Sequence, residues 1–301
     1  MTTSATTGSV SPGLRRRLQA FVYRHRTLQL LLLVVPPAGW FGVVYLGSLV
    51  VLFISAFWFL DPLTSAIVHE PTLANFKELL TNPVYRGIAF RTIGMAALVT
   101  GTDIVLAFPI AYFMARRAGP WQRRVLVVLV LLPLWSSYLV RVYAWRVILS
   151  PGGPLEWAFQ LIGIPGVVLY PSDLAMWIVF SYIWLPYMIL PVYAGLERIP
   201  GSVLEASSDL GARSAMTFRR IVLPLALPAV VAGSIFTFSL TLGDYITPTL
   251  VSNSQFIGNV VYASQGVAGN VPFAAAFALV PVAVMAIYLV IARRLGAFEA
   301  L

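Results

Sequence analysis

The sequence predicts an all-α polytopic membrane protein, and composition and apolar run length are the observations that predict it. Hydrophobic residues make up 59% of the 301-residue chain, charged residues only 10%, and the mean hydropathy is +0.86. A soluble domain is typically about 45–50% apolar and about 25% charged. Several apolar runs also reach the roughly 20 residues needed to cross a bilayer. The chain has no cysteine, which excludes disulfides, thiolate metal sites and a cysteine nucleophile.

Apolar run length predicts six transmembrane helices. The first run is too long for one straight crossing, and we expect Pro36-Pro37 to break its beginning. It is also too long for the apolar region of a signal peptide and no A-x-A-like cleavage site follows it, so we interpret it as a retained helix. The expected spans are Leu28–Leu60, Ile88–Ala115, Val125–Leu149, Leu174–Leu196, Ile221–Leu242 and Phe273–Ala292.

Basic residues assign the two sides of the membrane. Of the 20 Lys and Arg residues, 15 lie before the first span, between spans two and three, between spans four and five, or after span six. They are Arg15, Arg16, Arg17, Arg24, Arg26, Arg116, Arg117, Arg123, Arg124, Arg198, Arg213, Arg219, Arg220, Arg293 and Arg294. Because cytoplasmic loops carry the excess of Lys and Arg, both termini are predicted to be cytoplasmic. The net charge of +9 is thus a topology signal, and no nucleic-acid partner is expected.

A polar segment between spans four and five carries the most specific pattern. It reads Glu205-Ala206-Ser207, three residues, Gly211, nine residues, then Ile221, one residue and Leu223-Pro224. This pattern resembles the EAA loop of the permease subunits of bacterial ABC importers, with Ser207 in place of the second alanine. In that family the loop is a short cytoplasmic helix that docks on an ATPase subunit. The resemblance assigns ATPase coupling to Glu205, Ala206, Ser207, Asp209, Gly211 and Arg213.

The same segment has local signals of its own. Ser202 and Glu205 have capping-box spacing, so Glu205 serves this cap alone or the cap and the coupling role together. Asp209 and Arg213 stand at i and i+4, the spacing of a weakly stabilising helical ion pair. Gly211 would cost about 1 kcal/mol inside a helix, so a turn or a close-contact point between two short helices is expected there.

Four further segments resemble the spermidine/putrescine type of permease. They are residues 72–76, 132–145, 184–191 and 241–248. Relatives that move ferric iron, sulfate, phosphonates or opines share much of this pattern, so these substrates stay open beside polyamines.

The resemblance implies the fold of type I ABC importers. A basic cytoplasmic tail (1–27) and a first helix with an external segment (28–87) precede a MetI-like core (88–295). The core contains the EAA loop at 202–224, and a cytoplasmic tail (296–301) ends the chain. The implied location is the bacterial inner membrane. The implied partners are two ATPase subunits, which bind ATP and Mg, a second homologous permease and an extracytoplasmic solute-binding protein.

Other functional classes lack their signatures. A P-loop needs a glycine-rich run ending in Gly-Lys, and the only lysine, Lys77, lies between Phe76 and Glu78. Paired haem ligation is excluded because His25 and His69 both lie outside the spans. No metal site or cofactor is expected in this chain, and a membrane-embedded enzyme would lack its reactive groups. A channel or secondary transporter needs no docking loop and often shows inverted repeats or several intramembrane carboxylates.

Two acidic residues are candidates for the substrate pathway. Asp103 falls in the middle of span two, where a charge is expensive and faces a partner or a water-filled cavity. It meets a cationic substrate there, or it pairs with Arg141 or with a residue of a partner subunit. Asp244, followed by Tyr245, lies at the outer end of span five, either as a first contact for ammonium groups or as a helix-end carboxylate exposed to water.

Arginines and aromatic residues near the outer end of span three complete the set. Arg141 and Arg146 attract an anion, extend to the interface or pair with acids of a partner protein. The aromatic residues form an interfacial belt or a cage for a cation. These aromatic residues are Trp135, Tyr138, Tyr143 and Trp145.

Overall fold

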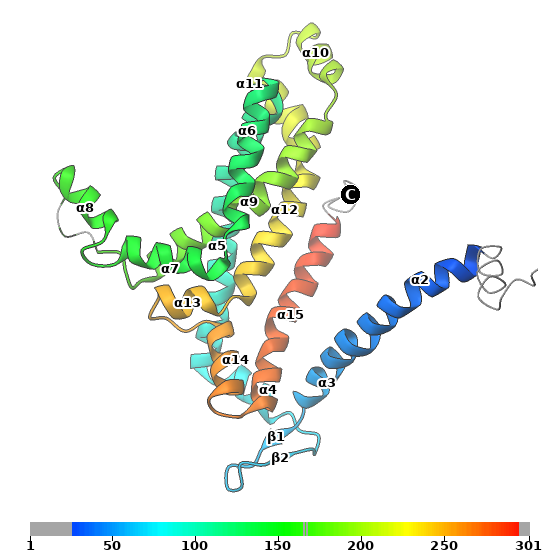
Figure 1. Ribbon diagram of the computed structural model, residues 1–301, viewed down its shortest axis with the longest axis vertical. Helices are drawn as coiled ribbons and strands as arrows, with labels where there is room; N and C mark the ends of the chain where they lie inside the picture. The colour runs from blue at the N-terminus through cyan, green and yellow to red at the C-terminus, as the bar shows by residue number, and fades with distance from the viewer. Residues whose placement is uncertain (1–25, 165, 167, 295–301) are drawn as a thin grey trace, which may run out of the picture. The chain divides into compact units, whose positions relative to one another are not determined.

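The computed structural model (Figure 1) describes residues 26–164, 166 and 168–294. The chain separates into two units, residues 1–54 and 55–301, which are described one at a time. The predicted tail at 296–301 lies outside the described residues, as does nearly all of the predicted tail at 1–27. Five helices are long and apolar enough to cross a membrane, or six if one bent pair counts as a single span.

The first unit is a continuous helical run rather than a helix broken at its beginning. Helix α2 (Arg26–Trp40) passes through both Pro36 and Pro37, and the π-helical turn η1 (Phe41–Leu46) follows it before α3 (Gly47–Ser55). The expected break at the proline pair is therefore wrong. Proline removes backbone donors and crowds the preceding turn, and the helix changes its hydrogen-bond spacing in the next turn instead, as π-bulges do. The span ends at Ser55, not at the predicted Leu60.

The second unit begins with a small hairpin and a short helix. Strands β1 (Phe59–Leu60) and β2 (Ile67–Val68) pair antiparallel. Helix α4 (Ala74–Thr81) is anchored by the buried Asn75, whose amide donates to the carbonyls of Ala56 (3.1 Å) and Trp58 (2.8 Å). This polar anchor explains why the chain leaves the helical course before Leu60.

Three long helices form the centre of the second unit. They are α5 (Pro83–Arg116), α9 (Asp173–Arg198) and α12 (Leu223–Gly243), with α15 (Val271–Arg294) beside α12 (Figure 1). Small residues let the backbones approach closely, as is common between membrane helices. A Cβ added at Gly195 of α9 would lie 2.2 Å from the Ala229 Cβ of α12. These four helices confirm predicted spans two, four, five and six to within a few residues, since apolar run length and helix length coincide there.

The predicted span Val125–Leu149 is not one continuous helix. Helix α6 (Pro120–Leu131) continues as the 3-10 turn η2 (Leu132–Trp135), and the chain then bends by 93° into the arm formed by α7 (Tyr138–Leu149) and α8 (Pro154–Leu161). Pro133 lies in the 3-10 turn, and the backbone is not helical at Ser136 (ψ 150°) and Ser137 (ψ 138°), so the α-helical ladder cannot continue. Twelve α-helical and four 3-10 residues rise roughly 26 Å, close to the about 30 Å hydrocarbon core. The α6–η2 segment alone therefore covers most of a crossing.

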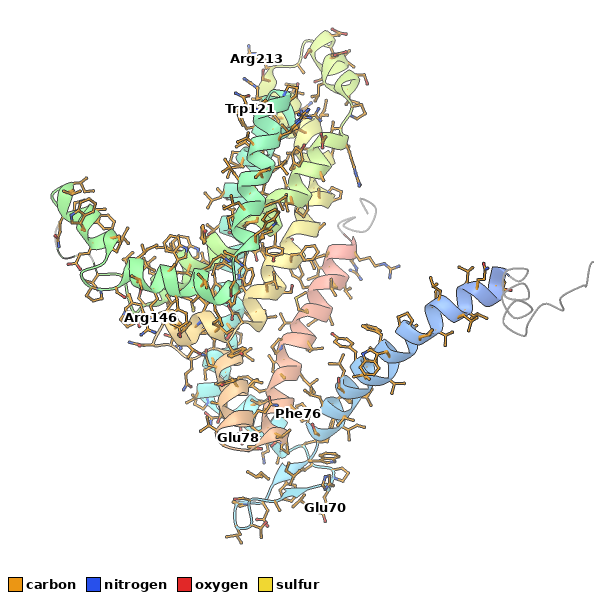
Figure 2. All side chains as sticks on the ribbon, in the orientation of Figure 1. Glu70, Phe76, Glu78, Trp121, Arg146 and Arg213 are labelled. Carbon is orange, nitrogen blue, oxygen red and sulfur yellow. The ribbon has the colours of Figure 1, made fainter. Side chains whose placement is uncertain are left out.

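Two groups of short elements lie at opposite ends of the long helices (Figure 1). At one end are α10 (Gly201–Asp209), α11 (Ser214–Thr217) and the π-turn η3 (Phe218–Val222). At the other are α4 and α14 (Ile257–Gly266), while α13 (Ile246–Val251) follows the end of α12. Figure 2 shows Trp121 and Arg213 at the first end and Phe76 and Glu78 at the second. The loops predicted to carry the positive excess between spans thus share one end of the unit.

Candidate coupling loop and membrane pathway

The loop between α9 and α12 is a two-helix turn. Helix α10 ends at Asp209, and Gly211 adopts a φ of +74°, the left-handed region that glycine enters without a Cβ clash. The amide of Gly211 donates to the Ser208 carbonyl (2.9 Å) and that of Ala212 to the Ser207 carbonyl (3.1 Å). The predicted turn at Gly211 is confirmed.

The two local pairings predicted for this loop are wrong. Pro200, with an extended backbone (φ −63°, ψ 140°), takes the N-cap position, so Ser202 lies inside the first turn and no capping box with Glu205 forms. Asp209 and Arg213 make no ion pair among the described residues, because Gly211 reverses the chain between them. Arg213 instead caps α11 with its main chain, which accepts from the Met216 amide at 2.8 Å.

Ser207, the one departure from the family pattern, has a structural role. Its side chain is 5% exposed and its hydroxyl lies 2.8 Å from the Thr217 hydroxyl, with either oxygen as donor. This hydrogen bond ties α10 to α11 across the turn. Thr217 is one of the nine unspecified positions between Gly211 and Ile221, so the motif does not predict this hydrogen bond.

The outer face of the loop is suited to a protein partner. Glu205 and Ala206 are exposed, and Leu210 is 88% exposed. A hollow of about 710 Å³ is lined by apolar side chains of both helices, among them Val203, Leu210 and Met216. A large exposed leucine beside an apolar hollow, on a loop that is otherwise polar, is typical of an interaction surface.

Asp103 lies deep in the packed core of the second unit. The residue is 0% exposed, and neither carboxylate oxygen has a hydrogen-bond partner among the described residues. Arg141, 9% exposed on α7, likewise leaves its Nε and one Nη without a described partner. The predicted ion pair between Asp103 and Arg141 does not form within this part of the chain. The helices that hold the two residues are separated by the 93° bend, which the apolar pattern does not encode.

Asp244 is not a water-exposed helix end. Its carboxylate accepts hydrogen bonds from the Tyr138 hydroxyl, from the Thr247 hydroxyl (2.9 Å) and from the Ile246 amide (2.8 Å). Tyr138 also stacks on Trp184, with ring centroids 5.6 Å apart. The bend that brings α7 back over α9 and α13 makes this contact between residues 106 positions apart.

The predicted aromatic cage does not assemble. Among the described rings, no two of Trp135, Tyr138, Tyr143 and Trp145 are in contact; Tyr138 and Trp145 pack instead on rings of α9. Trp135 and Tyr143 point outward, 90% and 49% exposed, so an interfacial belt stays the prediction for them. Tyr245 stacks on Tyr262 (4.9 Å), and Arg146, on the arm in Figure 2, lies over the Tyr170 ring at 5.6 Å.

A helical membrane core with a two-helix loop that presents an apolar hollow is typical of the non-catalytic permease subunit of a transport complex. The family model for the inner membrane component of binding-protein-dependent transport systems matches residues 107–297. The chain belongs to this family. It is therefore a multi-pass ABC importer permease subunit of the inner membrane.

Two named relatives are similar to most of the chain. The inner membrane ABC transporter permease protein YdcU of Escherichia coli K12 is 47% identical, covering 96% of each chain. The spermidine/putrescine permease PotB of the same organism is 31% identical over 74% of this chain and 82% of its own length.

Solved structures agree on the fold. A bacterial ABC transporter that imports alginate matches with a TM-score of 0.64 at 19% identity, covering 92% of this chain and 99% of the other. The MetNI methionine transporter matches with a TM-score of 0.55 at 16% identity, covering 72% and 96%. Such distant likeness supports the permease architecture and nothing about substrate.

Proposed function

We propose that this permease subunit imports polyamines, with spermidine and putrescine as the leading substrates. The 31% identity to PotB over 74% of the chain and the four sequence segments of that type support this assignment. The external half also carries an acidic, aromatic cluster around Asp244 and Tyr138. Ion pairing and cation–π contact with primary ammonium groups are the chemistry such a cluster offers.

The proposal includes an ATPase docked on α10, and the loop geometry is the observation that carries it. The exposed Leu210, the apolar hollow and the Gly211 turn form a compact surface at the end of the long helices. Glu205, Ala206, Asp209 and Arg213 frame this surface, while Ser207 braces it from within. In this proposal the coupling loop is cytoplasmic, and so are both termini. Two ATPases, which bind ATP and Mg, drive the pathway between outward and inward access by differential stabilisation of two conformations.

A second permease and a solute-binding protein complete the assembly. The pathway is enclosed by this chain and a homologous subunit, and the binding protein delivers substrate from outside. An anionic substrate such as sulfate or an aminophosphonate is the second candidate. Arg141 favours it, because two of its buried nitrogens lack a described partner.

Uptake of labelled spermidine and putrescine, in cells with and without this chain, tests the substrate. Ferric iron, sulfate and an aminophosphonate serve as competitors. ATP-dependent polyamine uptake that requires the chain and resists all competitors supports the proposal. Polyamine uptake that is the same without the chain refutes the polyamine proposal. Competition by sulfate or the aminophosphonate supports an anionic substrate, the second candidate.

A further inference from the structure

Two arginines cap helix ends at the point where the coupling loop begins. Arg116, the last residue of α5, donates from one Nη to the carbonyls of Leu196 (2.6 Å) and Ile199 (2.7 Å) at the end of α9. Arg123 of α6 donates to the carbonyls of Met114 (3.2 Å) and Ala115 (3.3 Å) at the end of α5. Each guanidinium therefore serves a helix other than its own.

These contacts satisfy groups that a helix cannot satisfy itself. The last four carbonyls of a helix have no intrahelical donor, and they form its negative end. Charge-assisted hydrogen bonds to such carbonyls are stronger than neutral ones. Arg123 also forms an ion pair with Glu197 (3.0 Å), but both side chains are more than a third exposed, so this pair adds little by itself.

The caps form a connected chain of elements. Arg123 joins α6 to the end of α5, and Arg116 joins α5 to the end of α9. Only Pro200 separates Ile199, the second acceptor of Arg116, from the first residue of α10. These hydrogen bonds, made by planar and rigid guanidinium groups, connect the start of α10 to the adjoining ends of α9, α5 and α6.

We propose that Arg116 and Arg123 are positioning residues for energy coupling. They make the coupling loop and the adjoining ends of α9, α5 and α6 move as one body when the ATPase moves α10. This inference rests on the proposed docking of α10. The described partners of both arginines are helix-end carbonyls and Glu197, so the expected defect is a loss of transport per ATP hydrolysed, not a loss of ATPase binding.

The first test compares variants in the complete complex in proteoliposomes. Arg116→Gln and Arg123→Gln are expected to lower the ratio of uptake to ATP hydrolysis about tenfold, the effect of losing about 1.4 kcal/mol of linkage. Arg116→Lys keeps the positive charge but loses the planar guanidinium and its fixed set of N–H donors. An intermediate ratio of uptake to ATP hydrolysis is therefore expected. Arg117→Gln is the matched control, because the exposed Arg117 side chain makes no hydrogen bond to the described residues. A wild-type ratio in both Gln variants, or an equal loss in the control, overturns the proposal.

The second test measures directly whether α10 and α6 move together. Because the chain has no cysteine, spin labels can be placed at Ser208→Cys on α10 and Arg124→Cys on α6, both exposed and both outside the lining of the apolar hollow. The distance between the labels is expected to stay the same with and without ATP, and to change with nucleotide once Arg116→Gln is added. A distance that already changes with ATP in the otherwise wild-type chain contradicts the inference. Failure of the wild-type chain to co-purify with its ATPase would instead refute the docking proposal.

Discussion

The Tyr138 hydroxyl donates a hydrogen bond to the Asp244 carboxylate, which joins the bent arm α7 to the end of α12. The Thr247 hydroxyl and the Ile246 amide donate to the same carboxylate. With three donors, Asp244 is held in place before any substrate arrives. Its first role is therefore to fix the arm over α9 and α13.

Removal of this hydrogen bond should destabilise the protein. Tyr138→Phe keeps the stacking on Trp184 and removes only the donor, so we expect a loss of about 1–3 kcal/mol, the range for a hydrogen bond to a charged group or a partner left unsatisfied. The measurement is the thermal midpoint of the purified complex. Tyr143→Phe, at an exposed position, is the control and should leave the midpoint unchanged. Equal midpoints for Tyr138→Phe and wild type would show that the contact contributes nothing.

The long helices could be predicted from the sequence, whereas the bend could not. Apolar run length set α5, α9, α12 and α15 to within a few residues, because a helix must satisfy its own backbone in lipid. The same run from Val125 to Leu149 is interrupted at Ser136 and Ser137. Hydropathy measures how apolar a segment is, not the direction in which its helix runs. The 93° bend therefore cannot be predicted from hydropathy.

In the functional loop, local chemistry was predictable and distant contacts were not. Gly211 follows from backbone propensity alone, and its φ of +74° agrees. Arg116 lies 80 residues from the Leu196 carbonyl that it caps, and from the sequence it was only a topology signal. Asp103 was expected to have Arg141 as a candidate partner, but that pairing depended on an arrangement of helices that sequence periodicity does not contain.

Close packing of α9 on α12 depends on Gly195. A Cβ at this position would lie 2.2 Å from the Ala229 Cβ, so Gly195→Ala should force the helices apart and cost about 1–3 kcal/mol, as overpacking does. The amount of folded protein in the membrane is the measurement. Ala229→Gly should restore it in the double variant. Gly101→Ala, where the added Cβ meets nothing within 4 Å, should be tolerated; if it is as harmful as Gly195→Ala, the explanation by close packing fails.

Uptake should fall when a substitution in the coupling loop disfavours the left-handed backbone at Gly211 or changes the charge at either of two positions, Glu205 and Gly211. Gly211→Asp and Glu205→Ala are expected to abolish uptake while the complex stays in the membrane. An L residue at a positive φ costs about 1–2 kcal/mol, and Glu205 is exposed to a partner. Gly211→Asn is the milder control, because asparagine, like aspartate, is tolerated at a positive φ but puts no charge beside the apolar hollow that Gly211 lines. Normal uptake by both Gly211→Asp and Glu205→Ala would remove the docking role from this loop.

Asp103 gives a prediction whose sign separates its two interpretations. An unpaired carboxylate buried at 0% exposure is costly in a low-dielectric core, and asparagine has nearly the same shape without the charge. If Asp103 has no partner in the assembled transporter, Asp103→Asn should raise the thermal midpoint of the complex and leave the KM for uptake unchanged. Asp173→Asn is the opposite control, because the Asp173 carboxylate accepts a hydrogen bond from the Ser252 hydroxyl at 2.6 Å. Neutralising this carboxylate should lower the thermal midpoint of the complex. A lower midpoint for Asp103→Asn would mean that the second permease supplies a cation, and a raised KM at unchanged stability would mean that the substrate does.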